Sequence, residues 1–139
     1  MQNAMKLTFS SLSENEAFAR NVVATFILNL NPTLSEINDI KTAVSEAVTN
    51  AIVHGYPDGV GEIELIARLD GRELYIEIID DGVGISDVKK ALEPCFTTGA
   101  ERSGMGFTVM QAFMDEVEVQ SAPNKGTRIT MTKRIAEAV

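Results

Sequence analysis

Alternation of apolar and polar residues along the chain predicts five half-buried strands. In the clearest pair, apolar side chains occupy every second position, and Asp70-Gly71 between the two strands is a hairpin turn signal. Residues 123–126 form the expected turn of a second hairpin near the end of the sequence. The expected strands cover residues 5–10, 62–69, 74–79, 117–120 and 127–132.

Apolar residues at helical spacing predict three longer helices. Residues 13–16 and 33–36 have the spacing of capping boxes, each with a hydroxyl at the first position and a glutamate at the last, so they mark the starts of the first two helices. The third is expected to open at Gly104. The expected apolar stripes are Ala17, Phe18, Val22, Thr25, Phe26 and Leu30 in the first helix, Ile37, Ile40, Val44, Ala47, Val48 and Ala51 in the second, and Phe107, Met110, Phe113 and Met114 in the third.

Length and composition favour one folded domain over residues 1–139, because 45% of the 139 residues are hydrophobic and 23% are charged. The apolar runs, such as residues 22–30, are too short to cross a bilayer, and residues 1–4 lack the basic and apolar regions of a signal peptide. We therefore expect a cytoplasmic protein that does not associate with a membrane.

The single cysteine, Cys95, excludes an internal disulfide, and with only one histidine, His54, the sequence has no Cys/His zinc cluster. Any metal would be held by oxygen ligands or by the phosphates of a nucleotide. The formal net charge of −8 argues against direct nucleic acid binding through a broad basic face. A regulator with this composition would act on another protein.

The sequence Asp80-Asp81-Gly82-Val83-Gly84 directly follows the third expected strand. Glycine lets the backbone come close to a flat ligand, and a carboxylate among apolar neighbours accepts a hydrogen bond from a donor such as an exocyclic amine. An ordinary turn built from Asp and Gly is the alternative explanation.

Glu46 and Asn50 lie one turn apart on the second expected helix, on a face roughly opposite its apolar stripe. Two polar side chains stacked in this way can contact the same ligand. The alternative is a solvated polar face. His54, near the end of the same helix, is interpreted as a packing or capping residue. Arg20 points off the stripe of the first helix, towards solvent or a partner.

Residues 94–103 are small and polar apart from Phe96, which predicts a mobile loop. Before this loop, Ser86 is expected to cap a short helix that runs to Leu92. After it, Gly104 and Gly106 precede a helix whose free backbone N–H groups and positive dipole end suit a phosphate.

Three of these elements, Glu46-x-x-x-Asn50, Asp80-x-Gly82-x-Gly84 and Gly104-x-Gly106, resemble in this order the N, G1 and G2 boxes of the ATP-binding fold shared by gyrase, histidine kinases and MutL. The phospho-acceptor helix of histidine kinases has no counterpart in this sequence.

Within that superfamily the chain is similar to the bacterial anti-sigma factors that are also serine-protein kinases, in particular those of the sigma-F type from endospore-forming bacteria. SEAVTNAIVHGY at 45–56, FTT at 96–98 and ERSGMGFTVM at 101–110 carry the resemblance, which covers nearly the whole chain. It implies an α/β two-layer sandwich of the Bergerat type, with a mixed, mostly antiparallel sheet and helices on one face.

The resemblance also implies a site for ATP or ADP. Asp80 would accept a hydrogen bond from the adenine amino group, and Gly82 and Gly84 would let the base lie close. Thr127 matches a threonine that supports the base-binding Asp through water, and Thr130 is its rival for that role. The other implied nucleotide contacts are Thr97, Thr98, Ser103, Gly104, Met105, Gly106 and Phe107.

For catalysis the resemblance implies that Glu46 is the general base for an incoming serine hydroxyl and that Asn50 binds Mg²⁺ through its amide oxygen. The lid over residues 96–103 would bring Arg102 to the phosphates; a solvated lid arginine is the alternative. The lid is short, and Cys95 and Gly99-Ala100 depart from the family's sequence around FTT.

The implied partners are a sporulation sigma factor, which the ATP-bound homodimer silences, and an anti-anti-sigma protein, which it phosphorylates on serine. Arg20 is our candidate for a partner contact, because an arginine fork suits an acidic protein surface; a solvated helix arginine is the alternative. Two rival functions are a nucleotide-gated binding module without kinase activity and an ATPase or histidine-kinase relative. Glu46 argues against the first, since gating needs no base.

Overall fold

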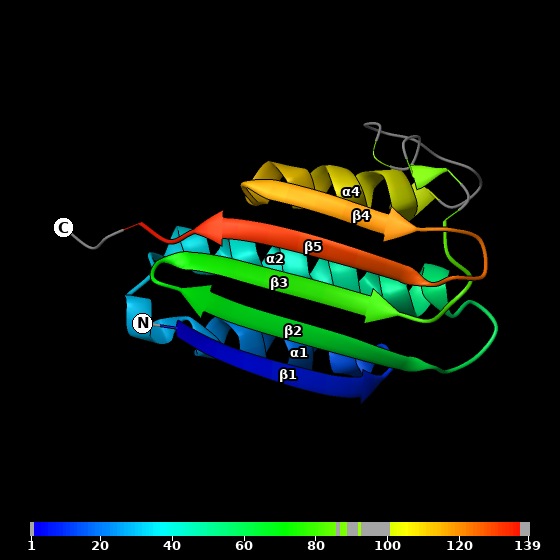
Figure 1. The fold of residues 1–139 in the computed structure, drawn as a ribbon, viewed down its shortest axis with the longest axis horizontal. Helices are drawn as coiled ribbons and strands as arrows, with labels where there is room; N and C mark the ends of the chain where they lie inside the picture. Colours follow the sequence, from blue (N-terminus) through cyan, green and yellow to red (C-terminus); the bar gives the residue numbers. More distant parts are fainter. Residues whose placement is uncertain (1, 86, 89–91, 93–100, 137–139) are drawn as a thin grey trace.

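Five strands form one sheet in the order β1-β2-β3-β5-β4 (Figure 1). The computed structural model describes residues 2–85, 87, 88, 92 and 101–136, with only the backbone for residues 101–105. The strands are β1 (Gln2–Ser10), β2 (Glu62–Asp70), β3 (Glu73–Asp80), β4 (Glu116–Ser121) and β5 (Thr127–Arg134). All five predicted strands are confirmed. The four pairings are antiparallel, so the sheet has no parallel pair among the described strands, where the sequence suggested a mixed one.

Three helices cover one face of this sheet, which confirms the predicted two-layer architecture (Figure 1). They are α1 (Glu14–Phe26), α2 (Leu34–Asn50) and α4 (Glu101–Phe113), with a 3₁₀ turn η1 (Leu28–Leu30) after α1 and a π-helical turn η2 (Ala51–Gly55) after α2. Helix α2 packs against both α1 and α4 and therefore occupies the middle of its layer. The expected short helix from Ser86 to Leu92 lies largely outside the described residues. No helix in the searched, described part of the chain combines the length and apolar character needed to cross a membrane.

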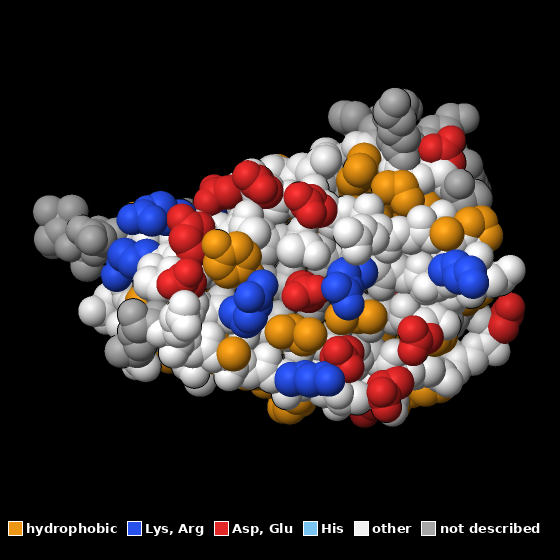
Figure 2. Space-filling model, viewed as in Figure 1, with side chains coloured by type: hydrophobic (Ala, Val, Ile, Leu, Met, Phe, Trp, Pro, Cys, Tyr) orange, Lys and Arg blue, Asp and Glu red, His pale blue; other side chains and the backbone are white. Residues whose placement is uncertain are grey.

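The core lies between the sheet and the helices. Along β2 and β3 every second side chain is buried, including Leu65, Ile76 and Ile78, and these face buried residues of α2 such as Val44 and Val48. Each fully buried side chain of this size contributes roughly 1.5–3 kcal/mol. The opposite face of the sheet carries interspersed positive and negative side chains (Figure 2).

Helix α1 buries a stripe that differs in part from the one predicted, since Phe26 and Leu30 do pack against the core but Phe18 does not. Ala19, Val23 and Ile27 are fully buried, whereas Phe18 is 52% exposed. The buried residues recur every four positions, and their smaller side chains allow α1 to pack closely against α2. The prediction relied on the large hydrophobic side chain of Phe18 and therefore placed part of the buried face on the wrong side of the helix.

The two predicted capping boxes have different outcomes. At α2 the box is present, because the Thr33 hydroxyl accepts from the Glu36 N–H at 3.1 Å and the Glu36 carboxylate accepts from the Thr33 N–H at 2.8 Å. At α1 the prediction was wrong, since Ser13 makes no side-chain cap. The carboxylate of Glu16 is used instead by Ser45 of α2 and by Arg20, so a tertiary contact displaced the local one.

This difference is testable by unfolding the protein in urea. Thr33→Ala is expected to lower the free energy of unfolding by about 1 kcal/mol, because the first turn of α2 loses its cap. Ser13→Ala is the matched control and is expected to change it by no more than about 0.5 kcal/mol. Equal losses in the two variants would contradict the assignment of the caps.

Candidate functional site

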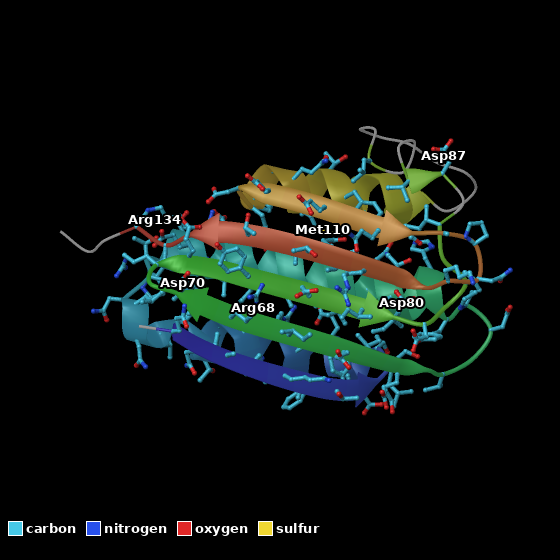
Figure 3. The ribbon with its side chains drawn as sticks, in the orientation of Figure 1. Arg68, Asp70, Asp80, Asp87, Met110 and Arg134 are labelled. Carbon is cyan, nitrogen blue, oxygen red and sulfur yellow. The ribbon has the colours of Figure 1, made fainter. Side chains whose placement is uncertain are left out.

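Asp80 is the last residue of β3 and lies at the end of the sheet where α2 and η2 also end (Figures 1 and 3). It is only 4% exposed and shares the helix-facing side of β3 with Ile76 and Ile78. One carboxylate oxygen, Oδ1, accepts a hydrogen bond from the Gly82 N–H at 2.9 Å. Burial raises the pKa of Asp80, the bond from Gly82 opposes this, and the neighbouring charge of Asp81 raises it further.

Close backbone packing surrounds this carboxylate. A Cβ atom at Gly55 would lie 2.8 Å from Asp80 Oδ1, and one at Gly82 would lie 1.9 Å from the Gly55 carbonyl oxygen. The Val83 N–H donates to the same carbonyl at 2.9 Å. Gly84 has a φ of +76°, which favours glycine, and a Cβ there would meet the Ala122 carbonyl at 1.9 Å. The G1-like glycines thus bring the end of η2 and the turn after β3 into direct contact.

Tyr56 fixes the same turn, a role that sequence reasoning missed. Its hydroxyl accepts from the Asp81 N–H at 2.8 Å and donates to the Glu62 carbonyl at 2.7 Å. A Cβ at Gly61 would lie 2.2 Å from the ring, so the ring packs tightly on that glycine. In the sequence Tyr56 only marked the end of a helix; no local pattern indicates a partner 25 residues away.

Asn50 is the last residue of α2, at the start of the π-helical turn, and is only 8% exposed. The prediction that it lies on a face opposite the core was wrong, because α2 is enclosed by α1 and α4 as well as by the sheet. None of the hydrogen bonds recorded between described residues uses its side chain, so its amide is available to a ligand. A π-helical turn at this point is typical of functional sites.

Glu46 lies one turn before Asn50 and is half-buried. A Cβ at Gly106 would lie 3.3 Å from Glu46 Oε2, so the carboxylate is held against α4 at its glycine. The structure therefore brings Glu46 of the N-box pair beside the G2-like segment. His54 makes a contact of its own in this structure, and its packing or capping role stays a prediction.

Helix α4 begins at Glu101, three residues before the predicted start, and this corrects the expected geometry of Gly104 and Gly106. Gly104 is in the first turn, where backbone N–H groups lack a helical partner, but Gly106 is inside the helix. A glycine costs a helix about 1 kcal/mol, which does not prevent helix formation where close packing requires it. The Phe107 side chain belongs to the core, so only its backbone is available to a ligand.

The remaining lid residues are only partly covered by the structure. Thr97, Thr98 and the loop prediction for residues 94–100 lie outside the described residues, as does Cys95. Arg102, Ser103 and Met105 are placed in the first part of α4 by their backbone alone.

Thr127 and Thr130 are on opposite faces of β5. Thr127 pairs with Asp80, is 5% exposed and shares its face with buried Ile129. Thr130 pairs with Glu77 and has the opposite parity along the strand, so it faces away from the helices. Of the two rival threonines, only Thr127 lies beside Asp80.

Shallow hollows of about 390 and 340 Å³ flank Asp80, one lined by Gly55, Tyr56 and Gly82 and the other by Ser121 and Thr127. No group of three or more His, Cys, Asp or Glu suited to a metal ion is present among the described residues. A cation here would depend on a few oxygen atoms, such as the Asn50 amide oxygen, together with oxygens brought by a ligand.

A second polar cluster lies between α1 and α2. Arg20 donates to Glu16 at 3.1 Å and to the Ser45 hydroxyl at 3.4 Å, and its side chain remains 38% exposed. Its Nε is buried and has no hydrogen-bond partner in the part of the chain that the structure describes. These residues line a hollow of about 410 Å³ together with Lys41 and Thr42.

Comparisons with known proteins agree with this geometry. Residues 9–133 match the family described as Histidine kinase-like ATPase domain. The anti-sigma F factor of Thermoanaerobacter sp. (strain X514) is 58% identical over 135 residues, which cover 96% of this chain and 94% of that protein. The anti-sigma F factor of Bacillus subtilis (strain 168) is 50% identical over 141 residues, covering 99% and 97%.

The chain belongs to the anti-sigma F factor family. Its fold is similar to a crystal structure of the RsbU and RsbW domains of a Mycobacterium tuberculosis protein, with a TM-score of 0.70, 23% identity and coverage of 99% of this chain and 34% of that one. The family assignment and the predicted fold class are thus confirmed, and a histidine kinase-like ATPase domain implies a nucleotide site.

The raised pKa of Asp80 leads to a prediction about stability. Between the ordinary carboxyl value of 3.8 and the raised one, the folded state binds more protons than the unfolded state, so stability falls as pH rises through this window. Asp80→Asn removes this titration and keeps an oxygen that can accept from Gly82. We expect its free energy of unfolding in urea to exceed that of the unmodified protein at pH 7, with the difference shrinking towards pH 3. Asp58→Asn, on an exposed loop, is the control; an Asp80→Asn difference that is independent of pH would contradict the assignment.

Proposed function

We propose that this protein is an anti-sigma factor of the sigma-F type that is also an ATP-dependent serine kinase, silencing a sporulation sigma factor and phosphorylating its anti-anti-sigma antagonist. The observation that carries the kinase part is the position of Glu46 and Asn50. The Glu46 carboxylate lies beside Gly106, one helical turn from the buried Asn50 amide at the end of α2. The π-helical turn that follows Asn50 ends at Gly55, which lies against Asp80. A site used only for nucleotide-gated binding has no need of that carboxylate.

In the nucleotide site, Asp80 accepts a hydrogen bond from the adenine amino group, and the close contacts of Gly55, Gly82 and Gly84 fix the backbone around its carboxylate. Thr127 lies beside Asp80 on the paired strand and supports it through a water that donates to both side chains. Backbone N–H groups of residues 101–104, in the first turn of α4, face the phosphates. The burial of the Asp80 carboxylate, which raises its pKa, supports this assignment.

In the transfer step Glu46 takes the proton of the substrate serine as its oxygen bonds to the γ-phosphorus. The bond from that phosphorus to the bridging oxygen breaks, and ADP leaves. Asn50 contributes an amide oxygen to Mg²⁺, which when bound neutralises phosphate charge. Arg102 adds positive charge from the first turn of α4.

Partner binding is assigned to Arg20, which the Glu16–Ser45 cluster holds at a polar hollow between α1 and α2. The Arg20 side chain is 38% exposed despite its bond to Glu16, so an acidic side chain of a bound protein can pair with the exposed part of the guanidinium. We further propose that the protein acts in the cytoplasm as a homodimer.

The kinase assignment is tested with purified protein, Mg²⁺, labelled ATP and the anti-anti-sigma protein encoded in the same genome. Glu46→Gln is expected to lower the rate of phosphoserine formation at least about 100-fold, because the base is lost, while the Kd for ADP changes little. Glu118→Gln, an exposed glutamate on β4, is the matched control and should keep the full rate. Label transfer unaffected by Glu46→Gln would contradict the assignment. Sigma capture without any transfer in the unmodified protein would favour the nucleotide-gated module.

The partner assignment is tested separately. Arg20→Gln is expected to weaken sigma-factor binding about tenfold or more in calorimetry, since the acidic partner group loses its cation, while ADP affinity stays unchanged. Lys6→Gln also removes one positive charge, but from the exposed face of β1, and should leave both affinities unchanged. Equal effects of the two substitutions would indicate general electrostatics rather than a contact at Arg20.

A further inference from the structure

Ser121, the last residue of β4, makes three hydrogen-bonding contacts through one hydroxyl group. It accepts from the Ile85 N–H at 2.7 Å, donates to the Gly126 carbonyl at 2.8 Å, and lies 2.8 Å from the Thr127 hydroxyl. These contacts join the segment after the G1-like glycines to the turn between β4 and β5. The residue matches none of the sequence motifs considered above.

The three contacts fix the direction of the bond between the two hydroxyl groups. A serine hydroxyl has one proton and two lone pairs. A carbonyl can only accept, so the Ser121 proton goes to Gly126, and the Ile85 N–H occupies one lone pair. All three contacts are satisfied only if Thr127 donates to the remaining lone pair of Ser121.

The direction of this hydrogen bond determines whether the Thr127 hydroxyl can donate or only accept on the side that faces Asp80. With its proton committed to Ser121, the Thr127 oxygen can only accept. Its cross-strand partner on the same face is Asp80, and directly opposed side chains in an antiparallel pair have Cβ atoms about 4.5–5.5 Å apart. Asp80 Oδ1 already accepts from Gly82, so the ionised carboxylate also offers only acceptors.

We propose that Ser121 is a specificity-determining residue: by holding the Thr127 proton it leaves the neighbouring Thr127 and Asp80 side chains with acceptors only, and this pair selects a 6-aminopurine over a 6-oxopurine. The inference rests on the nucleotide site proposed above and adds a residue to it. A 6-amino group brings two donors to these acceptors, whereas a 6-oxo group brings an acceptor that finds no donor there. Without Ser121 the Thr127 O–H can rotate towards the ligand and donate to the oxo group, directly or through one water.

The test compares ADP with inosine diphosphate, which replaces the 6-amino group by an oxo group and carries a proton on N1. Calorimetry gives the ratio of the two Kd values for each variant, and a ratio is insensitive to a partly unfolded fraction of the sample. Ser121→Ala is expected to lower the preference for ADP about five- to tenfold, the size of one hydrogen bond. Ser121→Thr keeps the hydroxyl and should keep the original ratio. Ser35→Ala, an exposed serine at the far end of α2, is the control.

A double-mutant cycle with Thr127→Val isolates the mechanism. In the Thr127→Val background there is no proton to release, so Ser121→Ala should leave the ratio unchanged. A ratio that still falls in that background, or a Ser121→Ala variant that weakens both diphosphates equally, would overturn the inference. Absence of binding of either diphosphate to the unmodified protein would instead reject the proposed nucleotide site itself.

Discussion

The burial of the Asp80 carboxylate is the constraint on which the rest of this site depends. A carboxylate with a raised pKa and 4% exposure makes folding less favourable at neutral pH, so the remaining structure has to offset that cost. The offset comes from the apolar residues of β2, β3 and α2 and from the Gly82 N–H. A stable fold that keeps such a group indicates that the carboxylate is retained for what it binds, because an apolar residue would be the simpler choice for packing alone.

Helix α2 connects this constraint to the chemistry. It packs against α1 and α4 as well as the sheet, so some of its polar side chains meet specific neighbours instead of open solvent. Ser45 bonds Glu16 of α1, and Glu46, the next residue, lies against Gly106 of α4. Asn50 lies one turn after Glu46, at the buried end of the helix.

Sequence patterns predicted the features that depend on local repetition, and they missed the features that depend on tertiary contacts. The strands followed from period-two alternation, and the box at Thr33 from its spacing, since both are properties of neighbouring residues. The exposed Phe18 and the uncapped Ser13 have one common cause: α1 is positioned by Ala19 and by the Glu16–Ser45 bond across to α2. No local pattern encodes that contact. Tyr56 and Ser121 escaped notice for the same reason, because their partners come from turns that are distant in sequence.

The two polar clusters on α2 have a consequence for regulation. Ser45 and Glu46 are about 100° apart around the helix, so the partner hollow and the candidate base occupy neighbouring sides of one rigid element. Under the proposed function, a protein that docks on Arg20 would therefore contact the same helix that carries the candidate base. A sigma factor docked at the same hollow would occupy the same approach. The proposed function thus leads us to expect that the two proteins compete for the hollow beside Arg20.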